Sequence, residues 1–276
     1  MLKTRVITAL VLLAIVLAVI FSKLFLVFSI VATLFFVSAI WESFRLFGSR
    51  HPVVGALLWG TVFGLLMARI ERSGFPEAVL FFGLCTAIWL IRLTPSLVLG
   101  LPPLEGVGNR LLTMIYGIAI LGCFLAITVA FRISPIYLFS IMAIVWIADI
   151  GAYFSGKAFG RHKLAPSISP GKSWEGAIGG WLAVLIFSSI TIFFPAFDGT
   201  FAFNVFSRWS WFGLVLVMTV LVAGSVVGDL FESQLKRRIN MKDSSNLLPG
   251  HGGVLDRMDA LIPTLPLAVL VHFWLQ

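Results

Sequence analysis

The chain has 276 residues, of which 59% are hydrophobic and only 12% are charged. A soluble globular domain carries about twice this charged fraction, so the composition excludes that class and indicates an integral membrane protein. The net charge of +8 would suit a nucleic acid, but the cations are spread over short loops beside apolar segments. We therefore expect no nucleic-acid partner.

Apolar windows long enough to cross the bilayer core recur along the whole chain. A membrane-spanning helix needs about 17 to 25 mostly apolar residues, and helices satisfy the backbone in lipid without the alternating pattern of a barrel. The sequence predicts an all-α, polytopic transmembrane bundle with cytoplasmic catalytic loops. We expect about nine spans, at 5–21, 24–40, 53–69, 76–93, 111–131, 135–155, 176–194, 211–231 and 258–275.

The first window begins like a signal peptide, because it follows Lys3 and Arg5. It then continues through Ile20 and Phe21 without a small-residue cleavage site. We interpret it as a retained span.

Small residues inside the predicted spans are expected to serve packing. Cys85 and Cys123 lie in apolar segments without metal-type spacing, and this predicts two buried thiols. The glycines inside spans are expected to let neighbouring helices approach closely; they are Gly55, Gly60, Gly64, Gly176, Gly179 and Gly180.

The distribution of cations predicts the orientation in the membrane. With nine spans, the N-terminus and the connections 41–52, 94–110, 156–175 and 232–257 share one side. That side holds 15 Lys and Arg residues, with Arg92 at the end of its span included, against five on the other. The positive-inside rule makes it the cytoplasmic side.

The two halves of the chain differ in polarity. Residues 1–131 form apolar spans with isolated polar residues such as Glu42 and Arg45. Residues 132–276 carry almost every group suited to chemistry, including the acids Asp149 and Asp229 near the ends of predicted spans. An acid inside a span is costly and marks a functional interior by default, although each could instead pair with a neighbouring helix.

Two further acids follow Asp229 in the sequence. Asp256 and Asp259 are three residues apart and would project from one face of a helix. Together with Asp229 they can form an oxygen site for Mg²⁺, which takes a few carboxylates plus substrate phosphate. First-turn acids also favour the helix dipole without any metal, but that alternative does not account for Asp229.

A glycine-rich turn precedes these acids. Gly250, Gly252 and Gly253 would let backbone N–H groups approach an anion at a helix N-terminus, as phosphate sites require. His251 between them could transfer protons or only shape the turn.

Cations surround the same acids. Lys236, Arg237 and Lys242 can neutralise a polyphosphate, whereas Arg257 between the two acids would equally serve a surface helix. The run Lys236, Arg237 and Arg238 could alternatively attract anionic lipids at the membrane surface.

A second polar interval, 156–175, is expected on the same side of the membrane. Gly171-Lys172-Ser173 is not a P-loop, because residue 166 is Pro166 and the motif needs glycine there. Lys172, Ser173 and Glu175 could contact a nucleotide or a lipid headgroup. Alternatively Ser173 only caps a helix, with acidic Glu175 near its start.

Residues 233–259 resemble the signature of the phosphatidate cytidylyltransferases, also called CDP-diacylglycerol synthases. Every fixed position is filled at the family's spacing, by Ser233, Leu235, Lys236, Arg237, Lys242, Asp243, His251, Gly252, Gly253, Val254, Asp256, Arg257, Met258 and Asp259. The upstream stretch DIGAYFSGKAFGRHKLAPSISPGKSWEG is also similar to the family. One departure is Gly171-Lys172, where members often carry two adjacent basic residues, so we expect one cation here.

The resemblance implies transfer of CMP from CTP to phosphatidic acid, giving CDP-diacylglycerol and pyrophosphate for phospholipid biosynthesis. It implies Mg²⁺ held by Asp229 and Asp256, with room for a second cation. The implied catalytic residues are Asp229, Asp256, Lys236, Arg237 and Asp259. The implied substrate-binding residues are Lys172, Ser173, Lys242, His251, Gly252, Gly253 and Arg257.

The same resemblance implies CTP, phosphatidic acid and membrane lipids as partners. It places the protein in a bacterial inner membrane with the active site facing the cytoplasm. A homodimer is one candidate assembly that the residues do not specify. Two other functions stay open: a CTP-dependent lipid kinase of the polyprenol type, and an ion transporter using Asp149 and Asp229, which would not need the His-Gly-Gly turn.

Overall fold

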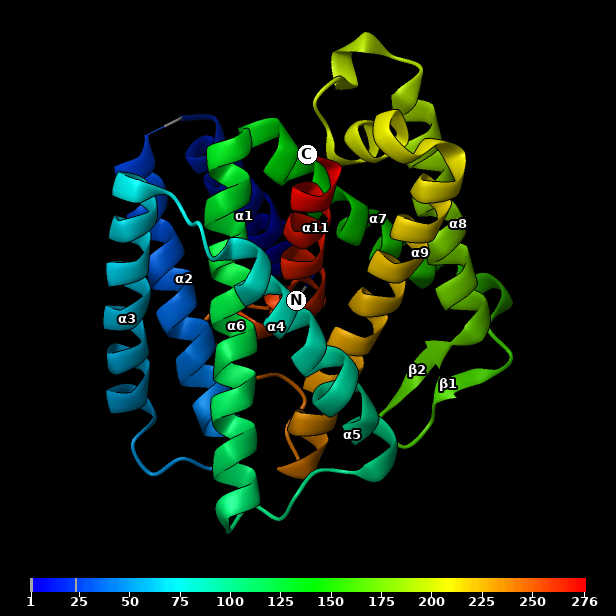
Figure 1. The fold of residues 1–276 in the computed structure, drawn as a ribbon. Helices are drawn as coiled ribbons and strands as arrows, with labels where there is room; N and C mark the ends of the chain where they lie inside the picture. Colours follow the sequence, from blue (N-terminus) through cyan, green and yellow to red (C-terminus); the bar gives the residue numbers. More distant parts are fainter. Residues whose placement is uncertain (1, 23) are drawn as a thin grey trace.

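The computed structural model describes residues 2–22 and 24–276, without the side chains of residues 2–6, 9 and 20. The chain forms a bundle of helices with one small hairpin at its side (Figure 1). The elements are α1 (Leu2–Ser22), α2 (Phe25–Leu46), α3 (Pro52–Ser73), α4 (Ala78–Ile88), a π-helical turn (Trp89–Leu93), α5 (Thr94–Leu99), α6 (Val107–Ile133), α7 (Pro135–Phe159), β1 (Lys163–Ala165), β2 (Ser169–Ser173), α8 (Trp174–Ile192), a 3₁₀ turn (Pro195–Phe197), α9 (Phe201–Arg238), α10 (Leu255–Met258) and α11 (Leu261–Leu275).

Eight of the helical segments in the described part of the chain are long and apolar enough to cross a membrane. They match the predicted spans from 24–40 onward and confirm the polytopic helical class.

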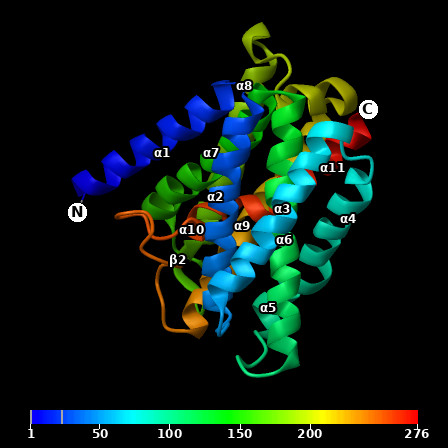
Figure 2. The same ribbon diagram turned by 90° about the vertical axis from the view of Figure 1, so that its left-hand side faces the viewer.

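The first predicted span, 5–21, lies in α1, where the described apolar stretch is Leu10–Val19. Figure 2 shows α1 inclined to α2, with its N-terminal end beside the turn that follows α9. There the Thr8 hydroxyl donates to the Pro249 carbonyl at 2.9 Å. That the first predicted span crosses the membrane therefore stays a prediction.

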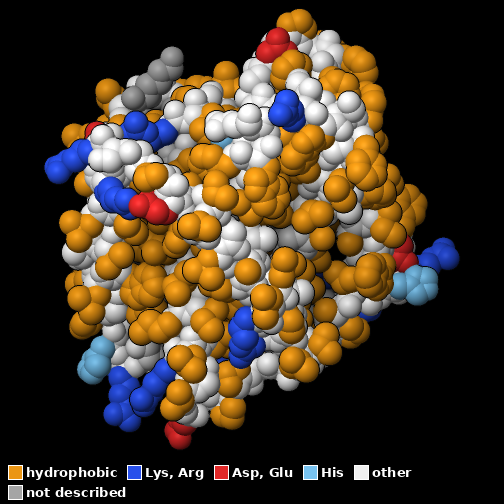
Figure 3. All heavy atoms as spheres, viewed as in Figure 1, with side chains coloured by type: hydrophobic (Ala, Val, Ile, Leu, Met, Phe, Trp, Pro, Cys, Tyr) orange, Lys and Arg blue, Asp and Glu red, His pale blue; other side chains and the backbone are white. Residues whose placement is uncertain are grey.

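The outer surface of the bundle suits a lipid environment. Figure 3 shows hydrophobic side chains over most of the visible face, with charged side chains mainly toward its edges. Leu80, Ile91 and Val98 are large apolar residues that are 77% to 90% exposed. Water would penalise such exposure, whereas lipid chains do not.

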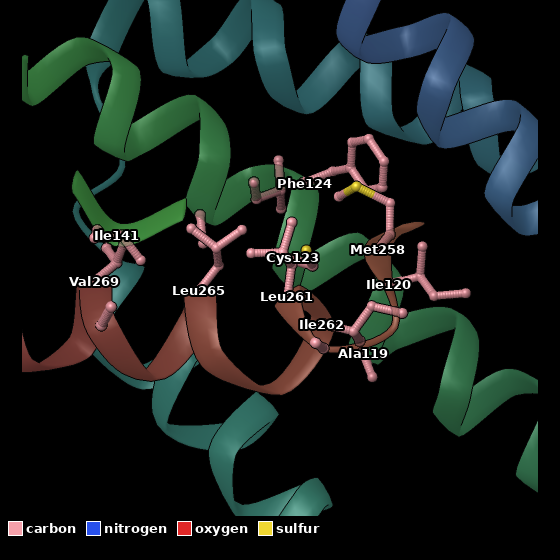
Figure 4. Close-up of a cluster of buried hydrophobic side chains, with 14 of the residues drawn as sticks. Ala119, Ile120, Cys123, Phe124, Ile141, Met258, Leu261, Ile262, Leu265 and Val269 are labelled. Atoms are coloured by element: carbon pink, nitrogen blue, oxygen red, sulfur yellow. The ribbon is translucent and has the colours of Figure 1, made fainter. Parts of the chain in front are cut away.

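The centre of the bundle is built by α6 and α11. α6 is the most buried of the candidate spans, and α11 packs against α4, α6 and α9. Figure 4 shows Cys123 and Phe124 of α6 among Leu261 and Leu265 of α11. Lipid is as apolar as these side chains, so the association depends on close packing more than on exclusion of water. Cys85 and Cys123 are both buried, as predicted.

Helices α7 and α8 approach each other closely through small residues. A Cβ added at Gly176 would lie 2.9 Å from the Ala152 carbonyl oxygen, and one at Gly180 would overlap the Ala148 carbonyl. The packing role predicted for the span glycines is thereby confirmed at these positions, but it is wrong for Gly64, where a Cβ would meet no atom within 4 Å. The close approach brings the end of α7, with Asp149, next to the start of α8.

The polar interval 156–175 was expected as a loop but contains a hairpin. Strands β1 and β2 pair antiparallel, with Lys163 opposite Ser173 and Ala165 opposite Ser169. A two-stranded hairpin is marginal by itself. Here it is continuous with both packed helices, because β2 leads directly into α8.

Ser173 and Glu175 build the junction between hairpin and helix. The Ser173 hydroxyl accepts from the Gly176 amide at 3.1 Å and caps α8. Glu175 lies 2.6 Å from His162 Nδ1 and accepts from the amides of Arg161 and His162. The cap is therefore present and Glu175 is engaged with the hairpin, while the substrate-binding role of Ser173 stays a prediction.

The end of α9 is tied to the N-terminal half. The Arg238 guanidinium donates to the carbonyls of Leu46 and Pro102 and to Asn109 Oδ1, at 3.0 to 3.3 Å. Arg238 is thus a structural cation that joins the end of α9 to the end of α2, the connection at Pro102 and the start of α6.

Candidate active site

A cavity of about 660 Å³ lies between α7, β2, α8, α9 and the start of the last span. Both polar intervals of the sequence contribute to its wall. The charged or hydroxyl-bearing residues that line it are Asp149, Tyr153, Lys157, Ser169, Lys172, Ser173, Ser225, Asp229, Lys236, Asp243, Asp256, Arg257 and Asp259. The acids and cations that the sequence places far apart therefore share one space.

One face of α9 supplies the centre of the site. Asp229, Ser233 and Lys236 are spaced at three and four residues, so they lie on the same side of the helix. The Ser233 hydroxyl donates to Asp229 Oδ1 at 3.3 Å. Lys236 forms ion pairs with Glu232, one turn earlier, and with Asp256 Oδ1 at 2.6 Å.

Asp256 contacts four donor groups, one of which, the Ser244 hydroxyl, also contacts Glu42. Besides Lys236, its Oδ2 accepts from the Ser244 amide at 2.8 Å, the Ser244 hydroxyl at 2.9 Å and the Gly253 amide at 2.7 Å. Such charge-assisted bonds are about twice as strong as neutral ones. The orientation of this carboxylate is therefore determined by the turn before it.

The second polar interval reaches the site through Lys172. Its ammonium lies 2.5 Å from Asp229 Oδ2, and both side chains are partly exposed. This pair joins the hairpin to α9. The two carboxylates that the resemblance assigns to a metal, Asp229 and Asp256, are thus each paired with a lysine.

The glycine turn is shaped by backbone geometry. Gly252 has φ +82°, which side chains other than glycine rarely adopt, and a Cβ there would lie 2.6 Å from Asp256 Oδ2. The Gly253 amide was expected to face a phosphate, and here it donates to Asp256. His251 is half-buried, its carbonyl accepts from Arg257 at 2.9 Å, and its ring is not among the cavity walls.

The structure separates some predicted site residues from the cavity. Arg237 and Lys242 are exposed, and neither is among the residues that line it. Their predicted catalytic and substrate-binding roles stay predictions. Asp259 does line the cavity, and its Oδ1 accepts from the Ala260 amide at 2.8 Å.

Two buried acids were not singled out from the sequence. Glu42 and Glu232 are both fully buried, and each contacts the residues around Asp256. Glu232 lies one turn before Lys236, a spacing visible in the sequence. Glu42 lies in the apolar half, and its partners are more than 200 positions away.

The acids suit a magnesium ion by the chemistry of their donors. Mg²⁺ takes carboxylate oxygens and is usually held by one or two carboxylates together with substrate phosphates. Among the described residues, no three His, Cys, Asp or Glu side chains are close enough to hold an ion by themselves. Asp229 and Asp256 fit the two-carboxylate type of site, in which the substrate completes the shell.

A helical membrane bundle around a cavity of acids and cations defines a membrane-embedded enzyme for phosphorylated substrates. The chain matches the cytidylyltransferase family over residues 3–275 and belongs to that family. It is 34% identical to the phosphatidate cytidylyltransferase of Haemophilus influenzae over 99% of each chain. It is 40% identical to that of Pseudomonas aeruginosa over 96% of this chain and 95% of the other.

A shorter match, 43% identical, joins 48% of this chain to 46% of the phosphatidate cytidylyltransferase of Staphylococcus haemolyticus. The family that the signature resembles is thereby confirmed. These relatives favour a nucleotidyltransferase over a lipid kinase or an ion transporter.

Proposed function

We propose that the protein transfers CMP from CTP to phosphatidic acid and releases pyrophosphate. A phosphate oxygen of phosphatidic acid bonds to the α-phosphorus of CTP, and the bond from that phosphorus to the β-phosphate oxygen breaks. The observation that carries this proposal is the Lys172–Asp229 pair, which joins the polar interval 156–175 to α9 across one cavity. The full-length relationship to phosphatidate cytidylyltransferases supports it.

The cations of the cavity meet the main electrostatic requirement of this reaction. Two unit negative charges 4 Å apart repel by about 4 kcal/mol at an effective dielectric constant of 20. Lys157, Lys172, Lys236 and Arg257 line the cavity and can offset that repulsion. Phosphatidic acid is already an anionic nucleophile, so the site needs charge compensation and alignment more than a strong base.

Asp229 and Asp256 would hold Mg²⁺, with room for a second cation beside it. Bound there with the substrate phosphates, the ion would stabilise negative charge on the transferring phosphoryl group and on pyrophosphate. Lys172 and Lys236 already contact these carboxylates. In this proposal the two lysines neutralise the carboxylate charges before the substrate binds and contact the substrate phosphates once it is bound.

We place the cavity at the cytoplasmic side of a bacterial inner membrane. The excess of cations on the side that holds both polar intervals supports this orientation. Small and apolar residues of α7 and α8, such as Ala152, Ala177 and Gly180, line part of the cavity. These residues suit contact with the acyl chains of the lipid substrate, whereas CTP would bind at the charged part of the cavity. A homodimer is tested by the mass of the detergent-solubilised protein.

Labelled CTP tests the proposal directly. With purified protein, Mg²⁺ and phosphatidic acid, label in the α-phosphate should appear in a CDP-lipid, with an equal amount of pyrophosphate. Transfer of γ-phosphate label to lipid would indicate a kinase instead. Absence of lipid-dependent pyrophosphate release would contradict the proposal.

A further inference from the structure

We infer that Glu42 of α2 is a positioning residue for the active site, because it holds the turn that carries Asp256. Only the kinetic part of this inference depends on the proposed function. Through this residue the N-terminal half of the chain contributes to the geometry of the active site. Glu42 is 0% exposed and lies outside the cavity, so it does not touch substrate.

Four donors from the signature turn surround the Glu42 carboxylate. Oε1 accepts from the Ser245 hydroxyl at 2.5 Å and the Val254 amide at 3.0 Å. Oε2 accepts from the Ser244 hydroxyl at 3.1 Å and the Leu255 amide at 2.6 Å. The two amides and the Ser245 hydroxyl donate to this carboxylate, whereas the Ser244 hydroxyl has one proton to share between Glu42 Oε2 and Asp256 Oδ2. The bonds compensate burial of a charged group that would otherwise be costly.

Ser244 connects Glu42 to the reacting centre. Its hydroxyl lies between Glu42 Oε2 and Asp256 Oδ2, and its amide donates to the same Asp256 oxygen. The Gly253 amide donates to Asp256, and the next amide, that of Val254, donates to Glu42. A shift of Glu42 would therefore move two of the groups that orient Asp256.

Gly253 allows this approach. A Cβ at this position would overlap both the Ser244 hydroxyl and the Glu42 carboxylate. The second glycine of the His-Gly-Gly turn is thus required by a carboxylate from α2. This explains a glycine at position 253, where no positive φ demands one.

Glutamine is the informative substitution, because it keeps the size of the side chain. Each carboxylate oxygen accepts from one backbone N–H and one hydroxyl. A hydroxyl can turn and accept from an amide NH₂, but a backbone N–H cannot. The glutamine NH₂ must therefore face either the Val254 or the Leu255 amide, whichever way it is turned.

The test combines hydrogen exchange with kinetics on the full-length protein in detergent. We expect Glu42→Gln to speed amide exchange over 243–255 and leave the hairpin 163–173 unchanged. We expect kcat to fall about 100-fold while KM for CTP changes less than about threefold, as for a misplaced catalytic group. Ser245→Ala removes one of the four bonds and should lower kcat about tenfold, which keeps the test valid should Glu42→Gln fail to fold.

Ser43→Ala is the matched control. Ser43 neighbours Glu42, is equally buried, and its hydroxyl has no hydrogen-bond partner among the described residues. It should match wild type in exchange over 243–255 and in kcat. Wild-type exchange in folded Glu42→Gln, or an equal kcat loss in Ser43→Ala, would overturn the inference. Failure of the wild type to convert CTP would instead overturn the proposed function. The hydrogen-exchange comparison would still test whether Glu42 holds the turn that carries Asp256.

Discussion

Lys172 Nζ lies 2.5 Å from Asp229 Oδ2, although Lys172 belongs to the polar interval 156–175 and Asp229 to the span α9, with the span α8 between them. The contact brings the polar interval 156–175 and the acid of α9 into one site. It also places a lysine ammonium beside a carboxylate that the resemblance assigns to a metal. The behaviour of this pair therefore distinguishes a site for phosphates from a purely structural ion pair.

Replacing Lys172 should affect substrate binding more than stability. Both side chains are a quarter to a third exposed, and such a pair contributes about 1 kcal/mol or less to folding. We expect Lys172→Gln to keep near wild-type thermal stability and to raise KM for CTP. Lys163→Gln changes a hairpin lysine outside the cavity and is the control. A large loss of stability with unchanged KM would make the pair structural.

Asp229→Asn and Asp256→Asn should each abolish most turnover while the protein still inserts and purifies. A catalytic metal supplies several kcal/mol of charge stabilisation, so loss of a ligand should lower kcat at least about 100-fold. Pyrophosphate release at saturating Mg²⁺ is the measurement, and the exposed Asp198→Asn is the control. Near wild-type rates in either variant would remove that acid from the metal site.

Gly252→Ala should impair folding and turnover together. The substitution adds a Cβ at φ +82° and 2.6 Å from Asp256 Oδ2. Alanine at positive φ costs about 1 kcal/mol or more, and Asp256 must also shift. Gly64→Ala meets no atom within 4 Å and is the control for thermal stability and kcat. Equal behaviour of the two variants would mean that the turn tolerates a side chain.

The neighbouring cations Arg237 and Arg238 should differ in their effect on stability. Arg238→Ala leaves two carbonyls and an amide oxygen without their donor, and each hydrogen bond to a charged group is worth about 1.5 to 3 kcal/mol. Arg237 is exposed, so Arg237→Ala should leave the melting temperature unchanged. Thermal unfolding in detergent compares the two. A similar melting temperature for both would contradict the structural role of Arg238.

Single cysteines should test the orientation of the site. Ser167 and Asn246 are exposed in the two polar intervals, and Asp198 is exposed between α8 and α9. Cysteines at 167 and 246 should react with a membrane-impermeant reagent only from the cytoplasmic side, and one at 198 only from the other side. Cys85 and Cys123 are buried and should stay silent. Labelling of 167 and 246 from opposite sides would contradict the shared site.

The sequence by itself determined the class of the protein and the position of its spans from residue 24 onward. A helix in lipid must satisfy its own backbone and match the bilayer thickness, so long apolar windows between charged loops are a local signal. The signature at 233–259 was equally local, because its residues lie within one short interval. The family relationship follows from that interval and was confirmed over nearly the whole chain.

Only the tertiary structure decided which polar groups meet. Glu42 looked like an isolated polar residue, yet four donors of a turn more than 200 positions away surround it. Lys172 reaches Asp229 because an unforeseen hairpin turns it toward α9. Hydropathy predicts that a helix lies in the membrane, but not which neighbour it packs against or how it is rotated about its axis. That rotation is set by close packing at small residues such as Gly176 and Gly180, and it decides which acids share the cavity.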